Sequence, residues 1–293
     1  MGNLVRVISE SGGIVLTAID TTKMVSESEK GHKTSAVVTA AMGRLVTAAS
    51  MMGVMLKDGK NSVTLRVDGG GEIGTMIAVS DGFGNSRVYV QNPIVEIPLN
   101  SAGKLDVGGA VGTDGYLTVV KDIGLREPYI GKIKLVSGEI AEDITSYYAI
   151  SEQIPTVCAI GVLVNPNLSV KHAGGFLVQL LPGATNEEIT YLENNISELS
   201  SVTQMMSEGK TPLDMAYTVL DGFNPSVLDE SEVFYKCNCS RDRVKNALVS
   251  MGKEELLSMA EEQPETEVCC HFCSNKYTFS KKDIISLAEE SSK

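Results

Sequence analysis

The sequence predicts an α+β protein in three parts: a core domain with a mixed β-sheet and packed helices (1–180), a helical linker (181–235) and a small C-terminal zinc-binding domain (236–293). Three observations predict this organisation. Short β-like runs separated by turn residues fill most of the stretch 62–179. Amphipathic helical periodicity begins after Pro182. Finally, five of the six cysteines fall in the last part of the chain.

The length and composition set the broad class. A chain of 293 residues has room for one full core and one or two smaller modules. It contains no Trp, so aliphatic side chains and the 12 Met must fill the core. The N-terminus lacks a basic region followed by an apolar run, so we expect no signal peptide. Clustered cysteines without an export signal indicate metal binding in a reducing, cytoplasmic environment.

The net charge of −12 is unevenly distributed. Residues 1–180 carry 17 acidic and 15 basic side chains, whereas 181–293 carry 20 and 10. Phosphate binding needs clustered Lys and Arg, so the acidic C-terminal part argues against nucleic acid as a partner.

The first elements are a hairpin and a core helix. Residues 3–20 contain two β-like runs around Ser11-Gly12-Gly13, which is typical of a hairpin. The apolar stretch from Ala36 to Lys57 is long enough to cross a membrane. However, Arg44 lies near its centre, and a central Arg costs several kcal/mol in lipid. We therefore predict a buried core helix and no membrane partner.

The β-rich stretch contains two features that resemble functional motifs. Gly69–Gly74 matches the string G-x-G-x-x-G, but a strand-like run follows it where a phosphate-binding loop needs a helix, so a glycine-rich hairpin is favoured. Cys158 lies in an apolar run without a charged neighbour, which is typical of a buried, inert thiol. The predicted strands are SVTLRVD, TMIAVSD, SRVYVQN, YLTVVKD, GVLVN and FLVQLLP.

The linker is predicted to be helical. Asn186 is a candidate N-cap for a helix with one apolar stripe that ends at Gly209, and Thr211 caps a second helix that stops near Gly222. Between 181 and 230 there are nine acidic residues and one Lys. The apolar face must dock to be stable, while the negative charge opposes docking. The alternatives are a weakly docked linker and an ordinary solvated face, and local charge alone favours the second.

The cysteines of the last part form two tight pairs. Cys237 and Cys239 are a C-x-C pair, Cys270 and Cys273 are a C-x-x-C pair, and 30 residues separate the pairs. Two thiol pairs that converge across a folded insert provide a tetrahedral four-thiolate site. Such a site has no open coordination position, so it predicts one Zn²⁺ per chain in a structural or redox-responsive role and no enzymatic activity.

The insert and the tail supply the rest of this small domain. Ser240 is a candidate cap for one helix, 253–262 reads as a second, and KYTF (276–279) as a strand. Ser280 and Asp283 resemble a capping box before a final helix. A module of this size has few large apolar groups, so metal and fold should be lost together.

The thiols of each pair are close enough in sequence to form a disulfide, Cys237 with Cys239 and Cys270 with Cys273. Oxidation would then remove the metal ligands and unfold the domain. The spacing does not separate such a switch from an inert zinc knuckle, although C-x-C favours the switch modestly. Four nearby cations would favour thiolates over thiols: Lys236, Arg241, Arg243 and Lys245.

Two neighbouring residues are alternative ligands. His271 lies between two ligands but would have to displace a thiolate, and Cys269 can compete with Cys270 or remain a spare thiol. Two other functions also compete. One is an adaptor or nucleic-acid-binding module with a purely structural zinc site. The other is a thiol-disulfide oxidoreductase built on the C-x-x-C pair, which lacks the expected βαβ context.

The chain resembles the heat shock protein 33 family, the redox-regulated 33 kDa chaperonins, over essentially its full length. The family pattern C-x-C, about thirty residues, C-x-x-C maps onto Cys237, Cys239, Cys270 and Cys273; Cys269 lies outside it. The resemblance rests on CNCSR (237–241), CHFCSNKY (270–277), GKLDVGGAVGTDG (103–115), VVKDIGLREPY (119–129), SGEI (137–140), SEQIP (151–155) and GGFLVQLLPGA (174–184).

The resemblance implies a holdase chaperone that is inactive while reduced and zinc-bound. Oxidation would form the Cys237–Cys239 and Cys270–Cys273 disulfides, release zinc, unfold the zinc domain and the linker, and expose apolar surface for unfolding client proteins. It also implies a homodimer on activation, with client binding and dimerisation assigned to the core domain.

Overall fold

The computed structural model describes residues 2–56 and 58–290. They divide into two compact units, Met1–Lys236 and Cys237–Lys293. The first unit contains two five-stranded sheets, and the second contains a two-stranded sheet. All pairings between the named strands are antiparallel. Helices cover both large sheets, so the predicted α+β class is confirmed.

The first sheet joins the two ends of the first unit. Its strand order is β10-β1-β2-β9-β8. The predicted hairpin around Ser11-Gly12-Gly13 is confirmed, since β1 pairs with β2 across it. The pairing of β1 with β10 joins residues that are far apart in the sequence, since Gly2 lies opposite Val233. The strands are β1 (Gly2–Ile8), β2 (Ile14–Asp20), β8 (Thr156–Val164), β9 (Val170–Leu180) and β10 (Ser226–Val233).

The second sheet has the order β5-β4-β3-β6-β7. The string Gly69–Gly74 connects β3 to β4, which pair antiparallel, and no helix follows it. A Cβ on Gly69 would lie 2.3 Å from the carbonyl oxygen of Gly112, so a close backbone approach requires glycine at this position. The strands are β3 (Ser62–Asp68), β4 (Met76–Asp81), β5 (Ser86–Val90), β6 (Tyr116–Asp122) and β7 (Tyr129–Lys134).

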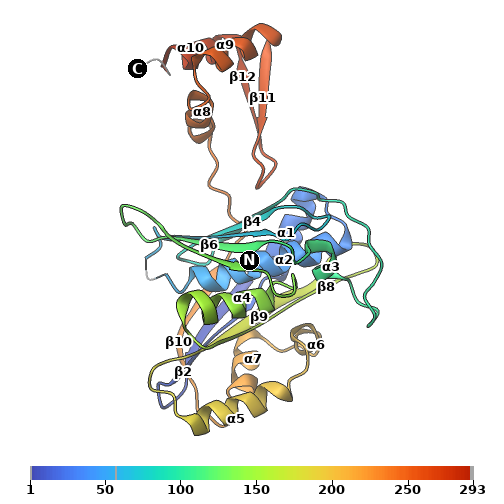
Figure 1. The fold of residues 1–293 in the computed structure, drawn as a ribbon, viewed down its shortest axis with the longest axis vertical. Coiled ribbons are helices and arrows are strands. Elements are labelled where there is room, and N and C mark those ends of the chain that lie inside the picture. Colours follow the sequence, from blue (N-terminus) through green and yellow to red (C-terminus); the bar gives the residue numbers. More distant parts are fainter. Residues whose placement is uncertain (1, 57, 291–293) are drawn as a thin grey trace. The chain divides into compact units, whose positions relative to one another are not determined.

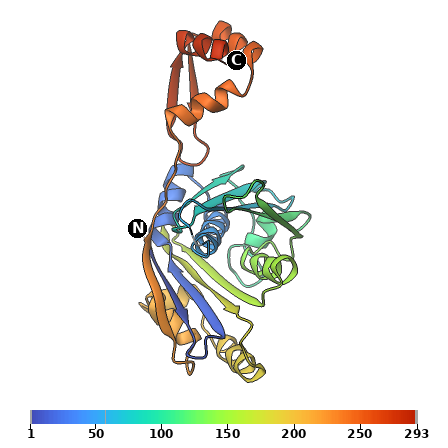
Figure 2. The same cartoon turned by 90° about the vertical axis from the view of Figure 1, so that its left-hand side faces the viewer.

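Helix α2 (Ala36–Gly53) lies between the two sheets (Figures 1 and 2). By length and composition it would qualify as a membrane span, but 89% of that window is buried inside the protein. The predicted core helix is thus confirmed. Arg44 is neutralised by an ion pair with Glu139. The same unit contains α1 (Thr22–His32), α3 (Val107–Val111), α4 (Ala141–Tyr147) and the π-helical turn η1 (Tyr148–Glu152).

Three helices pack on the other face of the first sheet: α5 (Asn186–Ser197), α6 (Val202–Ser207) and α7 (Pro212–Val219) (Figure 1). The predicted second helix with its Thr211 cap is confirmed. The predicted single helix from Asn186 to Gly209 is wrong in two respects. Its N-cap is Thr185, whose side chain accepts a hydrogen bond from the Glu188 N–H. The helix ends before Ser201, and Ser201 caps a separate helix, α6.

The end of the segment predicted as helical is a strand. Residues Ser226–Val233 form β10 at the edge of the first sheet. Their pattern of acidic and apolar residues has no helical stripe, and pairing with β1 satisfies their backbone. The helical part of the segment 181–235 therefore ends before β10.

The second unit surrounds a small core of its own. The predicted Ser240 cap is confirmed, as its side chain accepts from the Arg243 N–H. Ser280 and Asp283 form the predicted capping box, with hydrogen bonds of 2.9 to 3.3 Å. Its elements are α8 (Arg241–Val249), α9 (Lys253–Glu262), β11 (Glu265–Cys269), β12 (Lys276–Ser280) and α10 (Lys281–Glu290). Its buried apolar residues are Leu248, Leu256, Ala260, Phe279, Ile284, Leu287 and Ala288.

Candidate metal centre

The four predicted cysteines come from two short segments of the second unit. Cys237 and Cys239 lie in the extended chain that enters α8, which begins directly after its cap Ser240. Cys270 and Cys273 lie in the turn between β11 and β12. This turn is closed by two backbone hydrogen bonds, from Cys270 N–H to Asn275 and from Ser274 N–H to Cys270. The antiparallel strand pair thus presents both thiols at one end.

The four sulfur atoms all lie within 4.8 Å of one another. Cys237 Sγ is 3.7 Å from Cys270 Sγ, and Cys239 Sγ is 3.4 Å from Cys273 Sγ. A tetrahedral ion with bonds of about 2.3 Å to sulfur needs neighbouring sulfurs about 3.8 Å apart. The observed spacing fits such an ion, and four thiolates fill its coordination sphere. The cluster is therefore placed to hold a soft metal ion in a closed site.

The surroundings shift the pKa values of the thiols in different directions. Burial raises the pKa values of the Cys237 and Cys273 thiols. Burial acts in the same direction on Cys239, but hydrogen bonds outweigh it, chiefly from the Tyr277 hydroxyl, and lower the Cys239 pKa to about 7. At neutral pH the Cys239 thiol is therefore more readily ionised than the thiols of Cys237 and Cys273.

The other candidate ligands lie outside the cluster. The group of side chains close enough to hold a metal ion contains neither Cys269 nor His271. Cys269 is exposed, and it ends β11 opposite Lys276. Cys158 belongs to the first unit and is buried, and this burial raises the pKa of its thiol to about 12, as expected for an inert thiol. All six cysteines are free thiols in this structure.

Tyr277 contacts the cluster and was not predicted as a site residue. Tyr277 donates from its hydroxyl to Cys239 Sγ at 3.0 Å. Strand alternation would have identified it, because Tyr277 shares a strand face with the buried Phe279 and lies near the turn. Arg241, expected to favour thiolates, is directed elsewhere: it lies 4.3 Å from the Phe279 ring centroid and donates to the Thr278 carbonyl at 2.8 Å.

Known proteins share both the fold and the full length of the chain. The sequence model of the Hsp33 protein family matches residues 2–280. The 33 kDa chaperonin of Acetivibrio thermocellus is 46% identical over 286 residues, covering 98% of this chain and 96% of the relative. That of Clostridioides difficile is 47% identical over 287 residues, covering 98% of each. The crystal structure of the 33 kDa chaperonin from Thermotoga maritima matches with a TM-score of 0.91 at 36% identity, over 99% of this chain and 98% of that one.

An α+β unit of two sheets, joined to a small unit with a cluster of four cysteines, thus has the fold and length of proteins named as chaperonins. The functional class is a molecular chaperone. The chain belongs to the Hsp33 family, as the resemblance in its motifs predicted.

Proposed function

We propose that the protein is a redox-regulated holdase chaperone. Its reduced, zinc-bound form is inactive, and oxidation converts it into a form that binds unfolding proteins and prevents their aggregation. The observation that carries this proposal is the convergence of four free thiols within 4.8 Å of one another in a unit with a small core. A metal held there supports the fold, and an oxidant that reaches the thiols removes that support.

In the reduced form we propose one Zn²⁺ per chain, held by Cys237, Cys239, Cys270 and Cys273. Zinc, when bound, supplies a closed cross-link between the segment before α8 and the β11–β12 turn, with no open coordination position. This chemistry is structural, and no catalytic turnover is part of the proposal. Between residues 237 and 290 the apolar core of the unit contains seven buried residues, too few to hold a fold of this size easily on their own.

Oxidation pairs Cys237 with Cys239 and Cys270 with Cys273. In each pair two thiolates give two electrons to one peroxide molecule, whose O–O bond breaks while it takes up two protons and leaves as two waters. One S–S bond forms per pair. The sulfurs then no longer act as thiolate ligands, so zinc leaves and residues 236–293 unfold.

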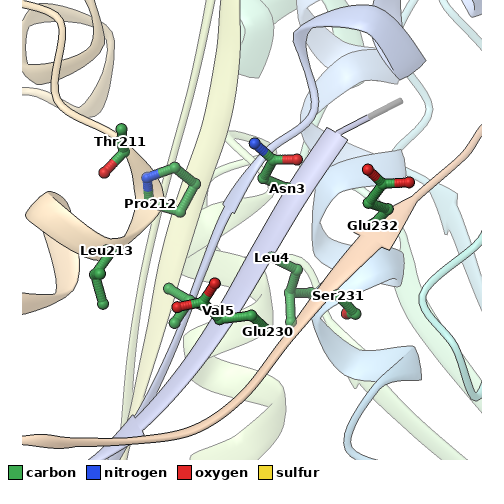
Figure 3. A pocket seen from close by; sticks show the side chains of 9 residues that line it. All are labelled: Asn3, Leu4, Val5, Thr211, Pro212, Leu213, Glu230, Ser231 and Glu232. Atoms are coloured by element: carbon green, nitrogen blue, oxygen red, sulfur yellow. The ribbon is translucent and has the colours of Figure 1, made fainter.

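The adjoining segment 181–235 provides the surface that is exposed. Its helices bury an apolar face against β1, β2 and β9 of the 1–180 core. Figure 3 shows the edge of this contact, a groove where the start of α7 (Thr211–Leu213) faces β10 (Glu230–Glu232), with Asn3, Leu4 and Val5 between them. Nine acidic residues against one Lys in 181–230 oppose docking at this contact.

We therefore propose that loss of the zinc domain also releases this linker, uncovering the outer face of the first sheet for client proteins. The sheet residues of this face are Val5, Val7, Ile14, Leu16, Ala18, Phe176 and Val178. Such a contiguous apolar surface is suited to non-specific binding of unfolding chains and to association of two copies. We propose a homodimer on activation, a cytoplasmic location, and neither nucleic acid nor membrane as a partner.

The test follows zinc, thiols and client aggregation together. Reduced protein is treated with peroxide and mild heat, and zinc release, free thiols and aggregation of a heat-unfolding client are measured in the same samples. We expect one zinc and four thiols lost per chain, in parallel with a gain in aggregation suppression. Equal suppression by the reduced and oxidised protein would contradict the switch and favour a purely structural zinc site.

A further inference from the structure

The hydroxyl of Tyr277 is a side-chain group that touches the cysteine cluster without being a ligand. Tyr277 lies on β12, and its oxygen is 3.0 Å from Cys239 Sγ. Its ring is partly buried against the core of the second unit. The ring and the hydroxyl therefore have separate roles: the ring packs in the core, and the hydroxyl points to one sulfur.

The sulfurs of the cluster differ in how they are held. Cys237 accepts a hydrogen bond from the backbone N–H of Cys239, and Cys273 accepts one from the backbone N–H of Asn275. These donors are main-chain N–H groups, so exchanging one ordinary side chain for another leaves them in place. The donor to Cys239 from Tyr277 is a single side-chain atom, and a Phe at 277 would delete it while keeping the ring.

We propose that Tyr277 is a positioning residue of the metal centre, which fixes Cys239 Sγ in the cluster and stabilises its negative charge. A hydrogen bond to an ionised acceptor is about twice as strong as a neutral one. Outer-shell hydrogen bonds also orient ligands and tune the metal they hold. The proposal rests on the proposed function only in requiring that the four cysteines bind a metal ion.

The hydrogen bond also bears on oxidation. A donor at Cys239 Sγ holds electron density that the sulfur would otherwise offer to an electrophile such as peroxide. When Cys237 and Cys239 form a disulfide, two thiolates lose two electrons to the peroxide, which takes up two protons and leaves as two waters. Cys239 is then no longer an anionic acceptor. The Tyr277 hydroxyl therefore favours the reduced, metal-binding form over the disulfide.

The test is Tyr277→Phe in the full-length chain. Competition with a chelator should show zinc affinity reduced by about tenfold, the lower end of the range for outer-shell partners. Loading with Co²⁺ supplies a readout that packing alone would not move. Without the hydrogen bond, the sulfur-to-cobalt charge-transfer band should shift to lower energy. The matched control is Tyr217→Phe, at an exposed tyrosine of the first unit, which should change neither measurement.

A second variant keeps the test independent of folding. Replacing Tyr277 by 3-fluorotyrosine keeps ring and hydroxyl and makes the hydroxyl a stronger donor, so the band should move to higher energy. Unmoved bands in both variants, with zinc affinity as in the wild type, would overturn the proposal. The proposed function has a separate test in the wild-type protein. A wild type that binds no metal, or that gains no chaperone activity on oxidation, would count against the proposed function, whatever the Tyr277 variants show.

Discussion

Two adjacent cysteines have different environments: Cys269 ends β11, and Cys270 begins the turn that follows. Cys270 Sγ lies 3.7 Å from Cys237 Sγ, whereas Cys269 is exposed and outside the cluster. We therefore expect Cys270→Ser to weaken zinc binding severely, because a closed site loses one of four ligands. Cys269→Ser should bind zinc as the wild type does. Zinc affinity, measured by chelator competition under reducing conditions, checks both variants. If Cys270→Ser kept its affinity, Cys269 would be the ligand.

At the start of α10, the cap sets a pH dependence. The Ser280 backbone N–H and hydroxyl donate to Asp283 and hold the pKa of its carboxyl below the ordinary value. A lowered pKa in the folded state means that its contribution to stability is complete above the unfolded value and is lost as pH falls through the folded value. A carbon-detected NMR titration should show the Asp283 midpoint below that of an unfolded peptide. A midpoint at or above the peptide value would argue against the cap.

At the scale of elements, α6 shows how the linker region is held. On its buried face, the Met205 side chain is 1% exposed, whereas Ser207, two residues further along the same helix, is exposed. Met205→Ala should lower the free energy of unfolding of the first unit by about 2–5 kcal/mol, through lost burial and the cavity left behind. Ser207→Ala should change it by less than about 0.5 kcal/mol. Denaturant unfolding of zinc-loaded protein measures both, and equal losses would show that α6 does not depend on its buried face.

Local signals predicted helices and strands well, and distant pairings poorly. The caps at Thr211, Ser240 and Ser280 act within one turn of chain, so the sequence identifies them. The sequence also contains a signal for the start of α6, since Ser201 precedes an apolar run. The apolar stripe continues across this point, however, and therefore favoured a single helix. Strand β10 was not predicted, because its acidic sequence becomes a strand only beside β1, more than 200 residues away.

The same distinction holds at the metal centre. The spacing of the cysteines identified the four thiols that converge, because that spacing is the chemical requirement of the site. It did not identify the contacts between sulfurs of different pairs, or the Tyr277 hydroxyl, because both depend on how the β11–β12 hairpin packs beside the segment before α8. Tertiary packing decides these contacts.

For the whole molecule, the division into two units predicts two separable responses to metal removal. Within the described part of the chain, the second unit has a core of seven buried residues, whereas the first has two large apolar clusters. Chelation under reducing conditions should therefore abolish amide-exchange protection in α8, α9 and α10, while β3, β4 and α2 keep theirs. Exchange measured by mass spectrometry before and after chelation tests this. Retained protection in α8–α10 would show that the unit folds without metal.

Two sulfur contacts cross between the two pairs, Cys237 to Cys270 and Cys239 to Cys273, and this has a consequence for chain entropy. A link across the pairs closes a loop of about thirty residues and restricts the unfolded chain by roughly 3–4 kcal/mol. A disulfide within either pair closes a loop of only a few residues and restricts it by about half as much. An ion held by all four thiolates would close this long loop in addition to the two short ones, whereas disulfides within the pairs close only the short ones. Oxidation within the pairs would therefore add covalent bonds and still remove the one long-range restraint on the unfolded chain.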